Sequence, residues 1–215
     1  AALSIMEPFN TLSSLTKEDI SRNQLYKKNI YRDKFKLSSI DNSAFLKNLK
    51  IKIHIQTAKQ NDVKRVCQLN NKTNQFNFTG IKFTEEEVLD KIQNKSNKVI
   101  LANVSDKFGN HGITSIIFIK IEKDIAIIEN WVMSCRIFGK SIEYAFFQNI
   151  FNDLISDNIT TIKGNYFPTN KNTVISELYK SLNFNKLKKN TYTLTTSIFS
   201  KKNHVKHYCE IINEK

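Results

Sequence analysis

Residues 136–141 combine side chains that are typical of an anion-binding turn. Arg136 and Lys140 are cations, Gly139 lies between them, and apolar residues with helical spacing follow Ser141. The first backbone N–H groups of a helix lack intrahelical partners and carry a partial positive charge, and glycine lets a phosphate approach the backbone. The stretch therefore predicts a phosphate-binding turn. A tight strand–helix turn with solvated cations is the alternative.

Cys135 directly precedes this turn. A neighbouring cation and a helix N-terminus both stabilise a thiolate, the nucleophilic form of cysteine, so a thioester on Cys135 is chemically reasonable. The alternative is a buried, inert thiol, because free cysteines are among the most buried residues. Cys67 and Cys209 are interpreted as structural. The cysteines are too scattered for a disulfide framework, and no CxxC or HxxxH pair indicates a zinc site.

Two carboxylates are candidates for a general base. Asp106 and Glu129 fall near the ends of neighbouring expected strands. Asp106 could equally cap the glycine-bearing hairpin that follows it, where His111 could be its partner. Glu129 could be a solvated strand residue. The sequence leaves these alternatives open.

The expected secondary structure places the candidate residues at the ends of strands. Ile51, Ile53 and Ile55 alternate with polar residues, which predicts a half-buried strand. Thr84 and Glu87 predict a helix start with a capping box. Further strands are expected at about 98–105, 112–121, 124–134 and 159–166, with two more within 184–199, and further helices around 63–69, 141–156 and 171–181.

From residue 50 the elements follow the order strand, helix, helix, three strands, helix, strand, helix and two strands. We expect an α+β (α/β) fold with a mixed sheet of about seven strands, in which the strand 124–134 is central. A helical extension over 1–49 precedes this domain of residues 50–200, and a basic tail of residues 201–215 follows it.

This order resembles the fold of the GNAT (Gcn5-related N-acetyltransferase) family. Residues 136–141 resemble the GNAT pyrophosphate loop, with Ser141 at a position where glycine or alanine is usual. Residues 170–184 resemble the GNAT signature N-x-x-A-x-x-x-Y-x-x-x-G-F, with Tyr179 at its tyrosine and Asn183 at its glycine. The resemblance implies that Tyr179 protonates the leaving thiolate. The alternative is a tyrosine at the polar edge of a helix core.

Four ordered motifs resemble a narrower family, the FkbH-like proteins, which join a HAD-type phosphatase-like domain of subfamily IIIC to a GNAT-like domain. The motifs lie in residues 69–77, 106–112, 133–136 and 166–172. No D-x-D-x-T phosphatase signature is present. The resemblance implies transfer of an acyl group, with glyceryl as one candidate, onto an acyl carrier protein. It also implies a HAD-type domain in the full-length or a partner protein.

The resemblance also implies the ligand and its contacts. The cofactor would be CoA, acetyl-CoA or 4′-phosphopantetheine, bound without a metal in the cleft where two parallel strands splay apart. The implied cofactor-binding residues are Val132, Met133, Ser134, Arg136, Ile137, Phe138, Gly139, Lys140, Ser141 and Asn172. The implied substrate-binding residues are Asn74, Gln75, Asn77, Tyr166 and Thr169. For the first three of these, amide side chains that cap their own loop are the alternative.

The composition restricts the partners. The 215 residues carry a formal net charge of +13, but most cations are lysines in a chain rich in Asn and Ile, which indicates codon bias more than a nucleic-acid surface. The charge would attract an acidic acyl carrier protein. No apolar run has the length of a membrane span, so we expect a cytoplasmic acyltransferase. The alternative is a non-catalytic module that docks a carrier protein of a polyketide or tetronate pathway.

Overall fold

The computed structural model describes residues 42–199 and 207–213. The chain divides into two units, Ala1–Phe45 and Leu46–Lys215, and helix α2 (Asn42–Asn48) begins in the first and ends in the second. The helical segments expected before residue 42 lie outside the described residues. The sheet and the helices that follow α2 belong to the second unit.

Within the described residues, eight strands form one mixed sheet in the order β6-β7-β5-β4-β3-β2-β1-β8. They are β1 (Lys52–Thr57), β2 (Asn97–Asp106), β3 (Gly109–Glu122), β4 (Ile125–Met133), β5 (Thr161–Asn165), β6 (Asn185–Lys186), β7 (Thr191–Thr195) and β8 (Glu210–Asn213). Only β4–β5 and β1–β8 pair in parallel. The expected mixed sheet is confirmed, except that the basic tail contributes an eighth strand along β1.

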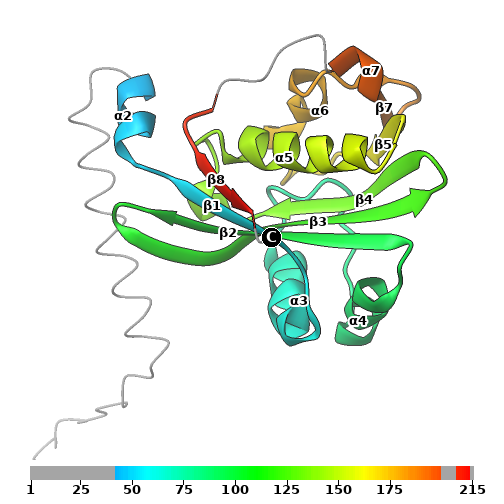
Figure 1. Cartoon of the computed structure of the whole chain (residues 1–215), viewed down its shortest axis with the longest axis horizontal. Helices are drawn as coiled ribbons and strands as arrows, with labels where there is room; N and C mark the ends of the chain where they lie inside the picture. Colours follow the sequence, from blue (N-terminus) through cyan, green and yellow to red (C-terminus); the bar gives the residue numbers. More distant parts are fainter. Residues whose placement is uncertain (1–41, 200–206, 214–215) are drawn as a thin grey trace, which may run out of the picture. The chain divides into compact units, whose positions relative to one another are not determined.

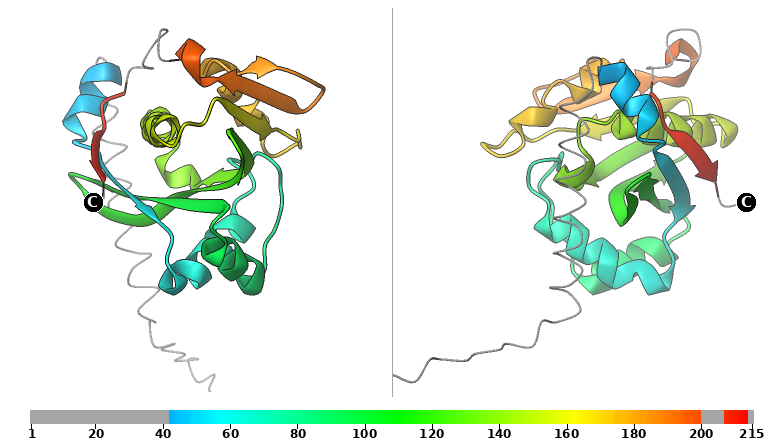
Figure 2. Two further views of the ribbon diagram at one scale, coloured as in Figure 1. Left: turned by 45° about the vertical axis from the view of Figure 1, so that its right-hand side comes forward. Right: turned by 90° about the vertical axis from the view of Figure 1, so that its left-hand side faces the viewer.

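Helices cover both faces of this sheet (Figures 1 and 2). α3 (Val63–Lys72) and α4 (Glu85–Gln93) lie on one face, and α5 (Ile142–Ser156) and α6 (Leu178–Ser181) lie on the other. The shorter helices are the 3₁₀ helices η1 (Gln60–Asp62), η2 (Cys135–Ile137) and η3 (Thr173–Ile175) and the four-residue α7 (Thr196–Phe199). The predicted capping box of α4 is confirmed, because the Thr84 hydroxyl accepts from the Glu87 N–H at 3.1 Å and the Glu87 carboxylate accepts from the Thr84 N–H at 2.7 Å.

The prediction of a single helix over residues 171–181 is wrong, because two separate short helices, the 3₁₀ helix η3 and the four-residue α6, replace it. At the expected helix start, the Thr169 Oγ1 accepts from the Asn172 N–H at 3.2 Å, and the Asn172 Oδ1 accepts from the Thr169 N–H at 2.7 Å. Local bonds from Thr and Asn side chains to the backbone compete with helix formation.

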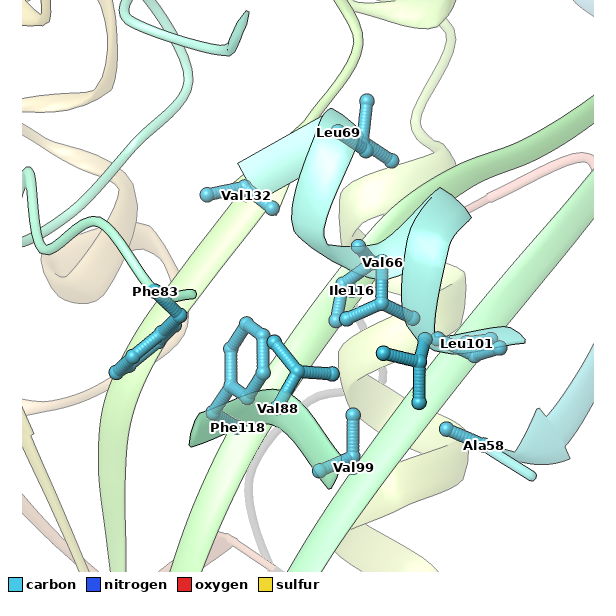
Figure 3. Close-up of a cluster of buried hydrophobic side chains, with 11 residues drawn as sticks. Ala58, Val66, Leu69, Phe83, Val88, Val99, Leu101, Ile116, Phe118 and Val132 are labelled. Carbon is cyan, nitrogen blue, oxygen red and sulfur yellow. The ribbon is translucent and has the colours of Figure 1, made fainter. Parts of the chain in front are cut away.

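A hydrophobic core lies between the sheet and helices α3 and α4 (Figure 3). Its buried members are Ala58, Val63, Val66, Leu69, Phe83, Val88, Val99, Leu101, Ile116, Phe118 and Val132. On the α5 face, Trp131 of β4 stacks on Phe147 with 5.9 Å between the ring centroids. The core under α3 and α4 and the Trp131–Phe147 contact under α5 lie on opposite faces of β4. β4 ends directly before the turn that the sequence predicts over residues 136–141.

Candidate functional site

β4 and β5 pair over only part of their length. The parallel pairing ends at Ile128 and Gly164. β4 then bulges at Glu129 and continues along β3 as far as Met133, whereas β5 continues along β7. The strands therefore splay, and the far half of β4 directs backbone groups towards an edge that β5 does not pair.

That edge is occupied by residues 76–78 of the same chain, which we call the strap. The Met133 N–H donates to the Phe76 carbonyl at 3.0 Å, and the Phe78 N–H donates to the Trp131 carbonyl at 3.2 Å. The strap therefore extends the sheet like a short antiparallel strand. It uses the backbone groups of β4 in the place where the sequence predicts the pantetheine arm.

The loop after β5 holds the strap from its other side. The Phe167 N–H donates to the Phe78 carbonyl at 2.8 Å. The Asn172 Nδ2 donates to the carbonyls of Asn77 at 2.8 Å and Phe167 at 3.0 Å. Asn172 is 1% exposed, so its amide contributes to the structure of the strap and is closed to a ligand in this conformation.

Other residues predicted to bind substrate belong to the same network. The Tyr166 hydroxyl donates to the Asn172 carbonyl at 3.2 Å. The Asn77 Nδ2 donates to the Thr73 carbonyl at 3.0 Å, and its Oδ1 accepts from the Gly80 N–H at 2.8 Å. Asn77 therefore caps its own loop, as in the alternative interpretation.

Tyr179 is enclosed behind the strap. It is 1% exposed, and its ring lies 4.5 Å from that of Phe78 and 5.0 Å from that of Tyr192 between centroids. Its hydroxyl is buried without a hydrogen-bond partner among the described residues. Burial, and then Tyr192, raises the pKa of the phenol. In this conformation a leaving thiolate cannot reach the hydroxyl.

The turn before α5 has the backbone of a tight loop. Gly139 has φ +76° and Ser141 has φ +61°, both in the left-handed region that favours glycine. The Lys140 Nζ donates to the Arg136 carbonyl at 3.4 Å. The first turn of α5 also holds Glu143, which is 5% exposed. Burial raises the pKa of its carboxyl, and a bond to its own backbone N–H lowers it.

Glu143 was not among the predicted site residues. Its carboxylate lies at the helix start that the sequence predicts as a phosphate site, and a carboxylate there competes with a phosphate for the same N–H groups. The sequence does carry a signal for Glu143, because it lies in the first turn of an expected helix, where acidic residues are common.

The clearest cavity beside the end of β4 lies on the α3 face, with a volume of about 370 Å³; we call it the α3 cavity. Its lining residues are Arg65, Gln68, Leu69, Lys72, Thr73, Asn74, Gln75, Phe76, Met133, Ser134, Cys135 and Arg136. It brings together six of the predicted residues, among them the exposed thiol of Cys135. The sequence analysis missed Arg65 and Lys72, which come from α3.

The two predicted general bases lie elsewhere. The Asp106 carboxylate accepts from the Phe108 N–H at 2.9 Å and lies 3.2 Å from the His111 Nε2, so it caps the β2–β3 hairpin. The Glu129 carboxylate pairs with Lys91 of α4 at 2.7 Å. Neither residue lines the α3 cavity.

The remaining predicted cofactor residues are mainly structural. Val132 and Ile137 are fully buried, and the Phe138 ring packs on Phe76 with 5.7 Å between centroids. Ser134, which lines the α3 cavity, has a fixed backbone, because its N–H donates to the Thr114 carbonyl at 2.8 Å.

Within the described part of the chain, no group of three or more His, Cys, Asp or Glu side chains is arranged to hold a metal ion. The helices described there are all too short or too polar to cross a membrane.

The sequence matches no protein-family model and no curated protein. Solved structures match it in fold. The ribosomal-protein-S18-alanine N-acetyltransferase of Escherichia coli is 11% identical, with a TM-score of 0.54 over 67% of this chain and 94% of that one. A spermidine/spermine N-acetyltransferase of Vibrio cholerae is 12% identical, with a TM-score of 0.53 over 70% and 96%. A GNAT-family acetyltransferase of Streptococcus pneumoniae is 15% identical, with a TM-score of 0.51 over 67% and 99%. The chain therefore has the fold of the GNAT acetyltransferases.

Proposed function

We propose that the protein transfers acyl groups from a thioester donor and that Cys135 is the nucleophile. One observation carries the proposal: at the end of β4 the exposed Cys135 opens into the α3 cavity, whereas Tyr179 is enclosed behind the strap. Arg136 and Arg65 line the same cavity.

The chemistry follows from that placement. The Cys135 thiolate attacks the carbonyl carbon of the donor thioester, and the bond from that carbon to the donor sulfur breaks. The donor leaves as a thiolate and takes a proton from solvent. The acyl group remains on Cys135 as a thioester until an acceptor thiol or amine attacks it and releases the cysteine.

The GNAT fold supports acetyl-CoA as a donor, because GNAT acetyltransferases use it. The FkbH-like motifs support a more specific form of the proposal. In that form, the donor or acceptor is the 4′-phosphopantetheine arm of an acidic acyl carrier protein, the acyl group is glyceryl, and a HAD-type phosphatase-like domain is the functional partner. The net charge of +13 would accelerate association with an acidic carrier protein.

The proposal predicts a clear order of thiol reactivity. Iodoacetamide should modify Cys135 well before Cys67 and Cys209. Burial, and then Glu143, raises the pKa of Cys209 to about 12. Burial, Glu85 and Glu87 raise the pKa of Cys67. Peptide mass spectrometry over time measures the order, and equal rates at the three cysteines would contradict the assignment of Cys135 as the reactive thiol.

The decisive experiment is intact-protein mass spectrometry after incubation with acetyl-CoA or, separately, with an acylated carrier protein. We expect an acyl adduct that maps to Cys135, is absent in Cys135→Ala and persists in Tyr179→Phe. Direct transfer gives the opposite result: Cys135→Ala retains transfer, and Tyr179→Phe loses it. That second outcome would overturn the assignment of the nucleophile.

A second candidate is a non-catalytic module that docks a carrier protein. The strap favours it, since residues 76–78 fill the edge of β4 where the pantetheine arm was expected. Salt-sensitive binding of the carrier protein by calorimetry, with no acyl adduct and no turnover, would support this candidate instead.

A further inference from the structure

The α3 cavity is lined by cations without a carboxylate. Arg65, Lys72 and Arg136 line it, and every other lining residue is neutral. Among the described residues, no ion pair joins Arg65 or Arg136 to a carboxylate. Arg65 is half-buried, and a half-buried arginine usually pairs with an acid because an uncompensated charge is costly to desolvate. Arg136 is exposed at the mouth of the same cavity.

Neutral groups orient both guanidinium groups. Arg65 donates from Nη1 to the Gln68 Oε1 and from Nη2 to the Ile113 carbonyl, each at 2.8 Å. Arg136 donates from Nε to the Ser134 Oγ at 3.2 Å. These bonds use only part of the N–H donors of each guanidinium, so the others can bind a ligand without a large reorganisation.

The two arginines also lie close enough to repel each other. Burial, and then the charge of Arg136, lowers the pKa of Arg65. A pair of like charges with free donors has unfavourable energy that an anion between them would offset.

The C-terminal end of α3 would normally repel an anion, because its last carbonyls carry partial negative charge. Here the Lys82 ammonium neutralises that end. Its Nζ donates to the carbonyls of Asn70 at 3.2 Å, Asn71 at 2.9 Å and Thr73 at 3.1 Å. The electrostatics of the cavity are therefore set by the three cations that line it, Arg65, Lys72 and Arg136.

We propose that the α3 cavity binds a small organic anion, a carboxylate or a phosphate monoester, with its oxygens between Arg65 and Arg136 and its apolar body against Leu69, Phe76 and Met133. The volume of about 370 Å³ is within the usual range for small-molecule sites. Cys135 lines the same cavity, so the anion is part of the acyl group or the acceptor. That last assignment rests on the proposed function, whereas the binding itself does not.

Calorimetry with three ligands of similar size tests the binding: benzoate, phenyl phosphate and benzyl alcohol. We expect at least one anion to bind about tenfold or more tightly than the alcohol, and the stronger anion identifies the ligand chemistry. Arg65→Gln and Arg136→Gln should each weaken that binding about tenfold. Lys64→Gln is the matched control, since Lys64 is an exposed cation of the same helix and does not line the cavity. Thermal melts verify that each variant is folded.

Three results would overturn the inference: no binding of either anion, equal binding of the alcohol, or equal weakening by Lys64→Gln. Arg65→Lys provides a further check, because it keeps the charge but loses the fork of donors, and it should also weaken binding. Anion binding without an acyl adduct on Cys135 would contradict only the proposed acyl transfer. The two proposals therefore fail separately.

Discussion

Glu143 shows how one residue can link packing to pH. Its carboxyl is 5% exposed, and one of its oxygens has no hydrogen-bond partner among the described residues. Because burial raises its pKa in the folded state, its contribution to stability is fully present below the unfolded pKa, near 4.3. That contribution is lost as the pH rises through the folded pKa.

Glu143→Gln should therefore increase the free energy of unfolding at pH 7 by about 1 kcal/mol, and the gain should shrink towards pH 4. Urea denaturation at the two pH values measures the change. Glu177→Gln is the control, because the Glu177 side chain is 76% exposed and pairs only with an exposed lysine. A loss of stability in Glu143→Gln at pH 7 would contradict the argument.

Gly164 and Tyr179 form a close contact between β5 and α6. A Cβ on Gly164 would overlap the Tyr179 hydroxyl and would lie 2.5 Å from its Cζ. Gly164→Ala should therefore lower the free energy of unfolding by about 2 kcal/mol or more. Tyr179→Phe should be neutral or stabilising on its own, because it removes a buried hydroxyl without a partner.

A double-mutant cycle measures the coupling between these two residues. Tyr179→Phe should recover only part of the loss in Gly164→Ala, because the ring carbon would still crowd the new methyl group. Additive effects of the two changes would mean that the contact is not close.

At the scale of elements, the strap depends on one side chain. Asn172→Ala removes the donors to the carbonyls of Asn77 and Phe167, which should cost about 1–3 kcal/mol of stability. Amide hydrogen exchange should accelerate at Phe78 and Met133, whose N–H groups form the bonds between the strap and β4. Lys171→Ala, an exposed neighbour, is the control. Unchanged exchange at both amides in Asn172→Ala would show that the strap does not need Asn172.

The sequence predicts elements whose signals are local. The alternation of Ile51, Ile53 and Ile55 predicts β1, and Thr84 with Glu87 predicts the start of α4; both are confirmed. The strap has no such signal, because it is three residues long and forms only through bonds to β4 and to the loop after β5. The helix predicted over 171–181 does not form as one piece, because hydrogen bonds between Thr169 and Asn172 compete with the helical hydrogen bonds at its expected start.

The residues of the candidate site also fall into two groups, those with a local sequence signal and those that only tertiary packing brings to the site. Cys135 and Arg136 are predicted because they adjoin a recognisable turn. Arg65 joins them only through the packing of α3 on the sheet, which no spacing in the sequence encodes. Tyr179 matches a motif, but its accessibility depends on Phe78, and that contact is also a tertiary one.

At the scale of the whole molecule, the last described strand covers an edge. β8 pairs in parallel with β1, from Lys52 opposite Glu210 to Ile55 opposite Asn213. Without β8, the outer edge of β1 would expose a row of unpaired backbone groups, which promotes pairing with other molecules. β8 then forms the outer edge itself, and its four residues present fewer unpaired backbone groups than the six residues of β1 would.

Deletion of residues 207–215 should lower the melting temperature and cause association that increases with protein concentration. Deletion of only residues 214–215 is the control, because it leaves β8 in place. Thermal melts and light scattering after size-exclusion chromatography measure both effects.

The deletion also removes an ion pair, because Glu210 of β8 pairs with Lys52 at 3.5 Å between two exposed side chains. The variant Glu210→Gln therefore separates the loss of this charge from the loss of strand pairing. That exposed ion pair contributes little, so Glu210→Gln should leave both the melting temperature and the state of association unchanged. If deletion of residues 207–215 changed neither the melting temperature nor the state of association of the full chain, the β1 edge would need no cover.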